Sequence, residues 1–176
     1  MPRKYKHKRE PLTLDDCNRL SNACSTMKDK LVVWTLLDTG LRVEEFCNMQ
    51  KENIDWQRHQ IVVYGKNTTG GPKKRRTVPM SDRVKPILES WIAANDRIGF
   101  TTKSAWETVR RVAQKAMVGQ KCCPHVLRHS FAVNSLDKGI PLPALQKILG
   151  HEDLATTAIY LNLSNVEALR MYREKW

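Results

Sequence analysis

The first fifty residues carry apolar side chains at the spacing of amphipathic helices. The apolar positions that share one face of the first expected helix are Leu14, Cys17, Leu20 and Cys24. Thr13 precedes them and can cap this helix. A second helix is expected over residues 28–37 and ends by Gly40, because glycine suits the left-handed backbone that follows many helices. A third helix is expected to begin near Arg42.

The spacing changes after residue 50 to that of short strands. Segments 53–56, 60–64 and 76–80 are rich in Ile, Val or aromatic residues, and turn-forming Gly, Asn and Pro separate the last two. These segments predict a small three-stranded antiparallel sheet. Its second turn, residues 65–75, is long and basic.

The remainder of the chain predicts helices. The expected helices span residues 81–94, 104–119, 124–139, 143–149, 153–161 and 165–176. Ser104 with Glu107, and Ser164 with Glu167, have the spacing of a capping box, and Pro124 suits the first turn of a helix. The expected fold class is therefore mainly α with one small antiparallel sheet (α+β).

A chain of 176 residues predicts one domain of ordinary size. Its first eleven residues are strongly basic and have little to bury, so we expect residues 1–11 to be a flexible arm or linker remnant and residues 12–176 to form the domain. The longest apolar run, residues 31–37, is far below the roughly 20 residues that a membrane span needs. No apolar segment of a signal peptide follows the basic start, so we expect a soluble protein without membrane contact.

The charge of the chain favours a polyanionic partner. Thirty Lys and Arg residues against eighteen Asp and Glu residues give a net charge of +12, and nucleic acid is the commonest polyanion. A basic protein without such a partner remains the alternative. Five scattered cysteines without a CxxC motif are typical of reduced thiols, which favours the cytoplasm.

Two polar segments carry candidate chemistry. His125 and Arg128 are three residues apart and would share a helix face, which places a proton-transfer group beside a cation that can hold phosphate oxygens. His151 follows an expected helix end, and Tyr160 comes one short helix later. The ordinary alternatives are surface or capping roles for the first three residues and a core position for the tyrosine.

A metal site is a further alternative for this region. His125 and His129 are four residues apart, and Cys122 and Cys123 lie just before them. Arg128 between the two histidines and the lack of an HExxH or CxxC frame argue against it, so no metal or other cofactor is expected.

Taken together, the motifs resemble the tyrosine recombinase family of phage integrases and Xer-type recombinases over nearly the whole chain. Residues 39–45 resemble the motif that contains the family's first catalytic arginine. Residues 63–66 resemble the strand and turn that bear the family's catalytic lysine. Residues 76–79 resemble the returning strand, residues 125–129 the HxxR box, and residues 149–160 the segment that ends in the nucleophile. The order and spacing of these motifs make the resemblance specific to the catalytic domain.

The resemblance implies cutting and rejoining of DNA strands without metal or ATP. Tyr160 would attack phosphorus, store the bond energy in a 3′-phosphotyrosine ester and release a 5′ hydroxyl. Arg42 and Arg128 would bind the nonbridging oxygens, where a lost donor costs about 3–4 kcal/mol by analogy with an oxyanion hole. DNA recombination or integration is the expected outcome; type IB topoisomerase-like relaxation and a non-catalytic DNA-binding regulator are the alternatives.

The remaining catalytic roles of the family fall on four residues. His125 would assist proton transfer at the nucleophile, Lys66 would protonate the leaving oxygen, and His151 would donate a further hydrogen bond to the phosphate. Glu45 would orient these groups from behind, with Glu44 as the alternative. Lys73 or Lys74 could replace Lys66 because the hairpin is long. The residues expected to contact the DNA backbone are Lys73, Lys74, Arg75 and Arg76.

The resemblance also concerns the two ends of the chain. Family members normally place a separate DNA-binding domain before the catalytic domain, so the chain is expected to be a fragment or a minimal enzyme that relies on its basic arm. The expected partner is double-stranded DNA, with contacts between protomers in a DNA-bound tetramer. The last helix, residues 165–176, would dock on a neighbouring protomer or fold back on its own core.

Overall fold

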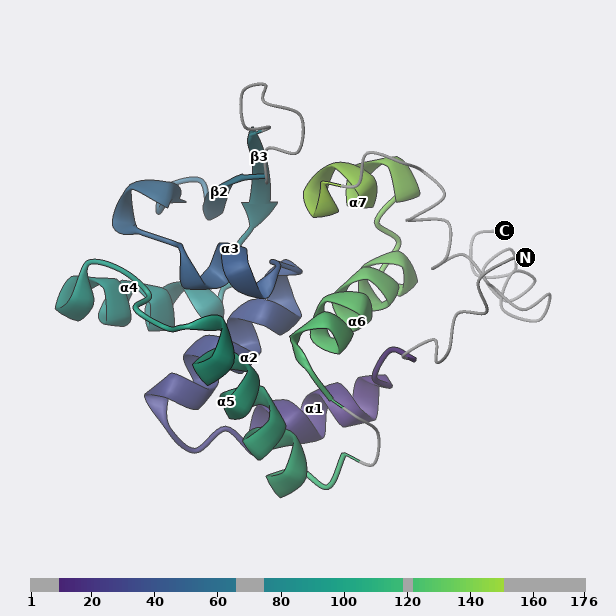
Figure 1. Ribbon diagram of the computed structural model, residues 1–176. Coiled ribbons are helices and arrows are strands. Elements are labelled where there is room, and N and C mark those ends of the chain that lie inside the picture. Colours follow the sequence, from purple (N-terminus) through teal and green to yellow (C-terminus); the bar gives the residue numbers. More distant parts are fainter. Residues whose placement is uncertain (1–9, 66–74, 119–121, 151–176) are drawn as a thin grey trace, which may run out of the picture.

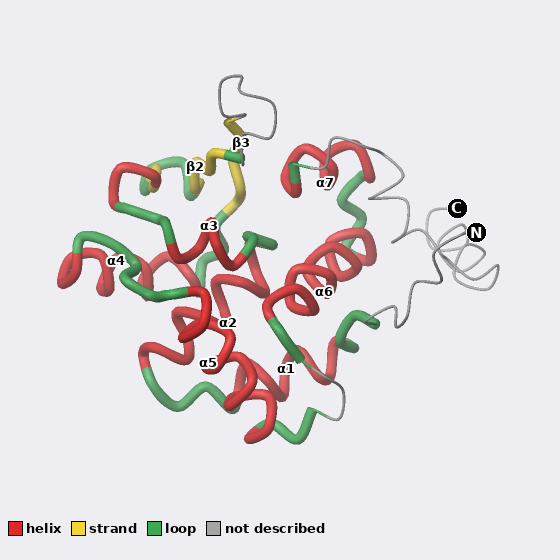
Figure 2. The backbone as a smooth tube through the Cα atoms, in the orientation of Figure 1, coloured by secondary structure: helices red, strands yellow, loops and turns green. Residues whose placement is uncertain are grey.

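The computed structural model describes residues 10–65, 75–118 and 122–150. These residues form a mainly helical domain with a three-stranded antiparallel sheet at one end, as predicted (Figures 1 and 2). The expected arm, the hairpin tip and the two last expected helices lie mostly or wholly outside the described residues. None of the helices in the described ranges has the length and apolar composition of a membrane-spanning helix.

Local capping residues mark the ends of the first three helices. Helix α1 spans Leu14–Asn22, and the side chain of Thr13 accepts a hydrogen bond from the backbone of its first turn, as predicted. Helix α2 spans Met27–Thr39 and ends at Gly40, which has a φ of 62°. Helix α3 is the short segment Val43–Cys47. The caps therefore set the two ends of the turn between α2 and α3.

Helix α2 is the centre of the domain. It packs against α1, α3 and three later helices, so nearly every side of it is covered (Figure 1). Its fully buried apolar side chains are Leu31, Val32, Val33 and Leu36. Because this helix is fixed on so many sides, the turn that follows it has a defined position relative to the rest of the core.

The sheet follows a short 3-10 helix, η1 (Lys51–Asn53). Its strands are β1 (Ile54–Asp55), β2 (Gln60–Tyr64) and β3 (Arg75–Pro79), in that spatial order. The inward-facing apolar side chains are Ile54, Ile61, Val63 and Val78. The pairing of Val63 with Arg76 puts Arg76 on the same side of β3 as Val78, which is the side that faces the core.

Two of the predicted helix starts differ from the structure. Helix α4 spans Val84–Asn95 rather than beginning at Ser81, because the Ser81 hydroxyl donates a hydrogen bond to Asp38 and residues 81–83 form a turn. Helix α5 spans Thr102–Lys115, and its capping box pairs Thr101 with Ser104. The predicted capping box of Ser104 with Glu107 was wrong.

The HxxR segment lies on the first of the last two described helices. Helix α6 spans Pro124–Asp137 and packs against α2, and helix α7 spans Leu142–Leu149. A second small core joins them, formed by Phe131, Ala132, Leu145 and Leu149. Helix α7 also lies against β3, so the sheet, α6 and α7 surround the turn after α2.

Candidate active site

The turn between α2 and α3 needs a glycine at residue 40. Gly40 has a left-handed backbone conformation, which residues with a side chain rarely adopt. A Cβ there would also lie 2.3 Å from Cδ1 of Phe131 and 3.1 Å from Cδ2 of Leu149. The absence of a side chain lets α6 and α7 approach the turn closely. Arg42 follows two residues later at this junction.

Arg42 is the capping residue immediately before α3, and Glu45 of that helix holds it in place. The backbone N–H of Arg42 donates to Oε2 of Glu45 at 2.7 Å, and Nη1 donates to Oε1 at 3.0 Å. The side chain of Arg42 is still 45% exposed. Within the described ranges Glu45 is the acceptor for this guanidinium, and the exposed part of the Arg42 side chain can bind an anion.

Glu45 binds a second arginine, from the sheet. Nη1 and Nη2 of Arg76 donate to Oε1 and Oε2 at 2.6 and 2.7 Å, a bidentate ion pair in which both side chains are about nine-tenths buried. Burial by itself would raise the pKa of Glu45, but the hydrogen bonds and charge of Arg76, together with Arg42, hold that pKa below its usual value. Glu45 is therefore a carboxylate at neutral pH.

Arg76 also reaches the end of α7. Its Nε donates to the carbonyl oxygen of Ile148 at 2.9 Å. This carbonyl is one of the last four of the helix, which have no partner within the helix itself and carry the negative end of its dipole. A cation at this position therefore satisfies the acceptor and complements its charge.

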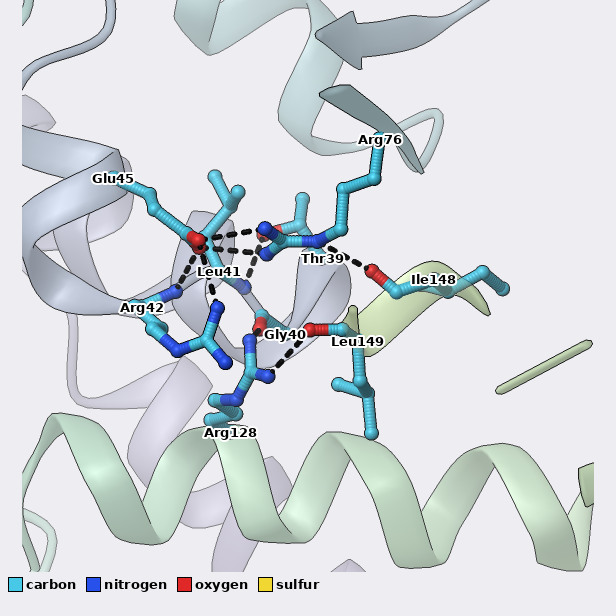
Figure 3. Close-up of polar contacts among 9 residues, drawn as sticks. All are labelled: Thr39, Gly40, Leu41, Arg42, Glu45, Arg76, Arg128, Ile148 and Leu149. Atoms are coloured by element: carbon cyan, nitrogen blue, oxygen red, sulfur yellow. Dashed lines mark hydrogen bonds and ion pairs between the residues drawn. The ribbon is translucent and has the colours of Figure 1, made fainter. Parts of the chain in front are cut away.

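Arg128 makes the second connection to the end of α7. Its side chain is buried, Nη1 donates to the carbonyl oxygen of Gly40, and Nη2 donates to the carbonyl oxygen of Leu149 at 2.7 Å. Figure 3 shows Arg76 and Arg128 reaching the adjacent carbonyls of Ile148 and Leu149 from two sides, with Arg42 close by. The two predicted phosphate-binding arginines, Arg42 and Arg128, therefore belong to one cluster.

Two histidines flank this cluster on α6. His125 lies in the first turn of the helix and is exposed, three residues before Arg128, as the expected helix places it. His129 is half-buried, and burial, followed by the nearby His125, lowers its pKa. His129 is thus biased toward the neutral form, whereas His125 stands at the surface where a substrate can reach it.

The structure brings together some of the predicted residues and does not describe others. Arg42 contacts the carboxylate of Glu45, and Arg128 binds the carbonyl of Gly40, two residues before Arg42. Arg75 is exposed at the start of β3. The predicted residues outside the described ranges are Lys66, Lys73, Lys74, His151 and Tyr160.

Arg76 is the predicted site residue whose position differs from the expectation. It was expected to contact DNA from the basic hairpin, whereas its three nitrogen atoms donate to Glu45 and Ile148 inside the protein. The alternation of the strand could have indicated this, because Arg76 is two residues before the buried Val78.

The metal alternative finds no geometric support in the described part of the chain. Among residues 10–65, 75–118 and 122–150, no three His, Cys, Asp or Glu side chains are grouped so that they could hold a metal ion. Cys122 and Cys123 are buried, and burial, with smaller contributions from nearby groups, raises the pKa of Cys122 to about 12. A thiol with that pKa stays protonated at neutral pH.

Three comparisons with known proteins agree on one family. The sequence model described as the phage integrase family matches residues 10–167. Tyrosine recombinase XerA of Thermococcus kodakarensis is 37% identical over 180 residues, which cover 93% of this chain and 61% of that protein. Tyrosine recombinase XerD of Listeria innocua is 27% identical over 186 residues, covering 93% of this chain and 61% of that protein. The chain thus spans about three-fifths of the length of these relatives.

Solved structures show the same fold. The crystal structure of XerA recombinase superimposes with a TM-score of 0.82 at 31% identity, covering 97% of this chain and 66% of that one. XerH site-specific recombinase, in a pre-cleavage complex with its difH substrate, superimposes with a TM-score of 0.76 at 20% identity, covering 95% of this chain and 55% of that one.

Proposed function

Because the chain belongs to the phage integrase family, we propose that it carries the catalytic part of a tyrosine-type site-specific DNA recombinase or integrase. In this proposal residues 12–176 form the catalytic domain and residues 1–11 a basic arm. The observation that carries the proposal is the cluster in which Arg128 donates to the carbonyl of Gly40, two residues before the exposed Arg42. This cluster has the composition that binding a phosphodiester requires.

The two arginines stabilise the negative charge that develops on the nonbridging oxygens of the phosphate. Attack on a phosphodiester puts negative charge on its nonbridging oxygens, and guanidinium groups already in position need not reorganise to receive it. Arg42 has exposed donors for this purpose. Two of the nitrogens of Arg128 hold the surrounding backbone, which fixes the orientation of its guanidinium plane.

The proton transfers belong to the remaining predicted residues. Tyr160 attacks phosphorus and forms a 3′-phosphotyrosine ester, His125 assists the transfer of the tyrosine proton, and Lys66 protonates the 5′ oxygen that leaves. His151 donates a hydrogen bond to the phosphate. The ester preserves the energy of the phosphodiester bond, so attack by a 5′ hydroxyl reverses the reaction and rejoins a strand.

Double-stranded DNA is the proposed partner, and protomers are proposed to contact one another on it as a tetramer in the cytoplasm. The net charge of +12 favours such a partner. XerH and the Tn1549 transposon integrase have been solved in complex with DNA, which supports the same partner for this chain. The exposed Arg75 and the hairpin lysines, Lys73 and Lys74, would contact phosphates.

The experiment mixes the protein with supercoiled DNA in EDTA without ATP, stops the reaction with SDS and detects DNA-linked protein. The proposal expects a covalent adduct from the wild type and none from Tyr160→Phe, which should bind DNA with wild-type affinity. An adduct from Tyr160→Phe would show that another residue is the nucleophile. Absence of both adduct and DNA binding in the wild type would overturn the proposed function.

A further inference from the structure

Arg76 occupies a position between the two halves of the candidate site. On one side its Nη1 and Nη2 bind both carboxylate oxygens of Glu45, and on the other its Nε binds the carbonyl of Ile148. Its side chain is 10% exposed. Each of its three nitrogens already donates within the protein, so this nearly buried guanidinium is committed to internal partners and little of it is presented to a DNA phosphate.

The carboxylate of Glu45 that Arg76 binds is also the one that binds Arg42. Each carboxylate oxygen of Glu45 accepts one hydrogen bond from Arg76 and one from Arg42, so the two arginines bind the same carboxylate plane from different sides. When Arg76 fixes that plane, the directions of the remaining lone pairs are fixed too. Arg42 is then held by its backbone and by one nitrogen.

The charges point to the same role. Glu45 carries one negative charge, and the buried Arg76 lies closest to it with two short contacts. Arg76 thereby balances the carboxylate, and the positive charge of the half-exposed Arg42 remains uncompensated for an anion. Without Arg76 the same carboxylate would neutralise Arg42.

The opposite side of Arg76 supports the end of α7. Besides the hydrogen bond to Ile148, the side chain packs on Gly150, where a Cβ would lie only 2.6 Å from Cδ of Arg76. Gly150 has a φ of 66° and ends the helix. Arg76 therefore holds the backbone immediately before His151.

We propose that Arg76 is a positioning residue, which orients Arg42 through Glu45 and fixes the end of α7 through Ile148. The inference rests on the proposed function, because orientation matters only if Arg42 binds the reacting phosphate. It assigns to Arg76 a role in the rate of strand cleavage at saturating DNA and not in DNA affinity.

The test compares Arg76→Gln and Arg76→Lys with Arg58→Gln, a control that removes one positive charge from an exposed turn of the same sheet, where Arg58 pairs with Asp55. Adduct formation is measured at saturating DNA, DNA affinity by titration and folding by thermal unfolding. Arg76→Gln should form adduct about 10- to 100-fold more slowly, by analogy with the loss of activity when a residue that orients a metal ligand is substituted. Arg76→Lys should recover part of this loss, and Arg58→Gln should match the wild type.

A second readout does not depend on activity. The carboxyl carbon of Glu45 is titrated by NMR in each variant, and the described charged groups that face it are Arg42 on its own helix and Arg76 on β3. Loss of Arg76 should raise the pKa of Glu45, while Arg58→Gln leaves it unchanged. If Arg76→Gln does not fold, Arg76→Lys, which keeps the charge and loses the bidentate contact, carries the same comparison.

The outcomes separate the two proposals. An unchanged rate in Arg76→Gln, or a loss confined to DNA affinity, overturns the positioning role and returns Arg76 to the DNA-contacting residues. An unchanged pKa of Glu45 overturns it as well. A wild type that forms no adduct counts against the proposed function, and the NMR titration still decides whether Arg76 controls Glu45.

Discussion

Nη1 of Arg128 donates a hydrogen bond to the carbonyl oxygen of Gly40, although the two residues are 88 positions apart in the sequence. The contact joins helix α6, which carries His125, to the turn that carries Arg42. The second amino group of the same guanidinium binds the carbonyl of Leu149, so the end of α7 is joined to both. One buried arginine thus fixes three segments of the candidate site relative to one another.

The close approach at Gly40 predicts a large effect of substitution there. Gly40→Ala combines a left-handed backbone with a Cβ that overlaps Phe131, and strain and overpacking together should cost about 2–6 kcal/mol of unfolding free energy. Gly99→Ala is the matched control, because Gly99 has a similar φ of 70° but nothing lies within 4 Å of its added Cβ. Urea unfolding of both variants measures the difference, and equal losses would contradict the packing argument.

The charge on Glu45 predicts how stability depends on pH. The pKa of Glu45 is lowered in the folded protein, so its contribution to stability is fully present above the unfolded pKa of about 4.3 and is lost as pH falls through the folded pKa. Glu45→Gln should cost about 2 kcal/mol at pH 7 and progressively less toward pH 3.

The measurement is urea unfolding of the wild type and Glu45→Gln at pH 7, 5 and 3.5. Glu44→Gln serves as the control, since Glu44 neighbours Glu45 on α3 and is exposed. A difference between Glu45→Gln and the wild type that stays constant down to pH 3.5 would show that the charge of Glu45 does not stabilise the fold.

Thr35 in α2 offers a stabilising substitution. Its side chain is fully buried, and its hydroxyl oxygen has no hydrogen-bond partner within the described ranges. Thr35→Val keeps the branched shape and removes the buried polar atom, so unfolding free energy should rise by about 1 kcal/mol. Thr108→Val is the contrasting variant, because the Thr108 hydroxyl donates to the carbonyl of Ser104. A lower stability of Thr35→Val would reveal a partner for this hydroxyl.

Arg75 and Arg76 should differ in how much each contributes to the salt dependence of DNA binding. If about six phosphates are neutralised, the logarithm of the binding constant should fall with the logarithm of salt concentration with a slope near −5. Arg75→Gln should make this slope about one unit less steep, because Arg75 is exposed, whereas Arg76→Gln should leave it unchanged. Titrations at several salt concentrations give the slopes, and a smaller slope in Arg76→Gln alone would reverse the assignment.

The local pattern of residues was enough to predict most helices and the sheet. Thr13 begins α1, and Gly40 ends α2, because a cap depends on backbone groups only a few residues away. The start of α5 could not be predicted from the local pattern alone. Two overlapping capping patterns compete there, and Thr101 prevails beside Phe100, whose ring packs against Phe46 and Trp91.

The same division runs through the candidate site. The family, the residue types and the helical spacing of His125 and Arg128 could be predicted from the sequence, because these are properties of short segments. The inward turn of Arg76 to Glu45, 31 residues away, and to Ile148, 72 residues away, is visible only in the folded chain. A buried charge must find its partner wherever the folded chain brings one, and a short segment holds no information about which distant group that is.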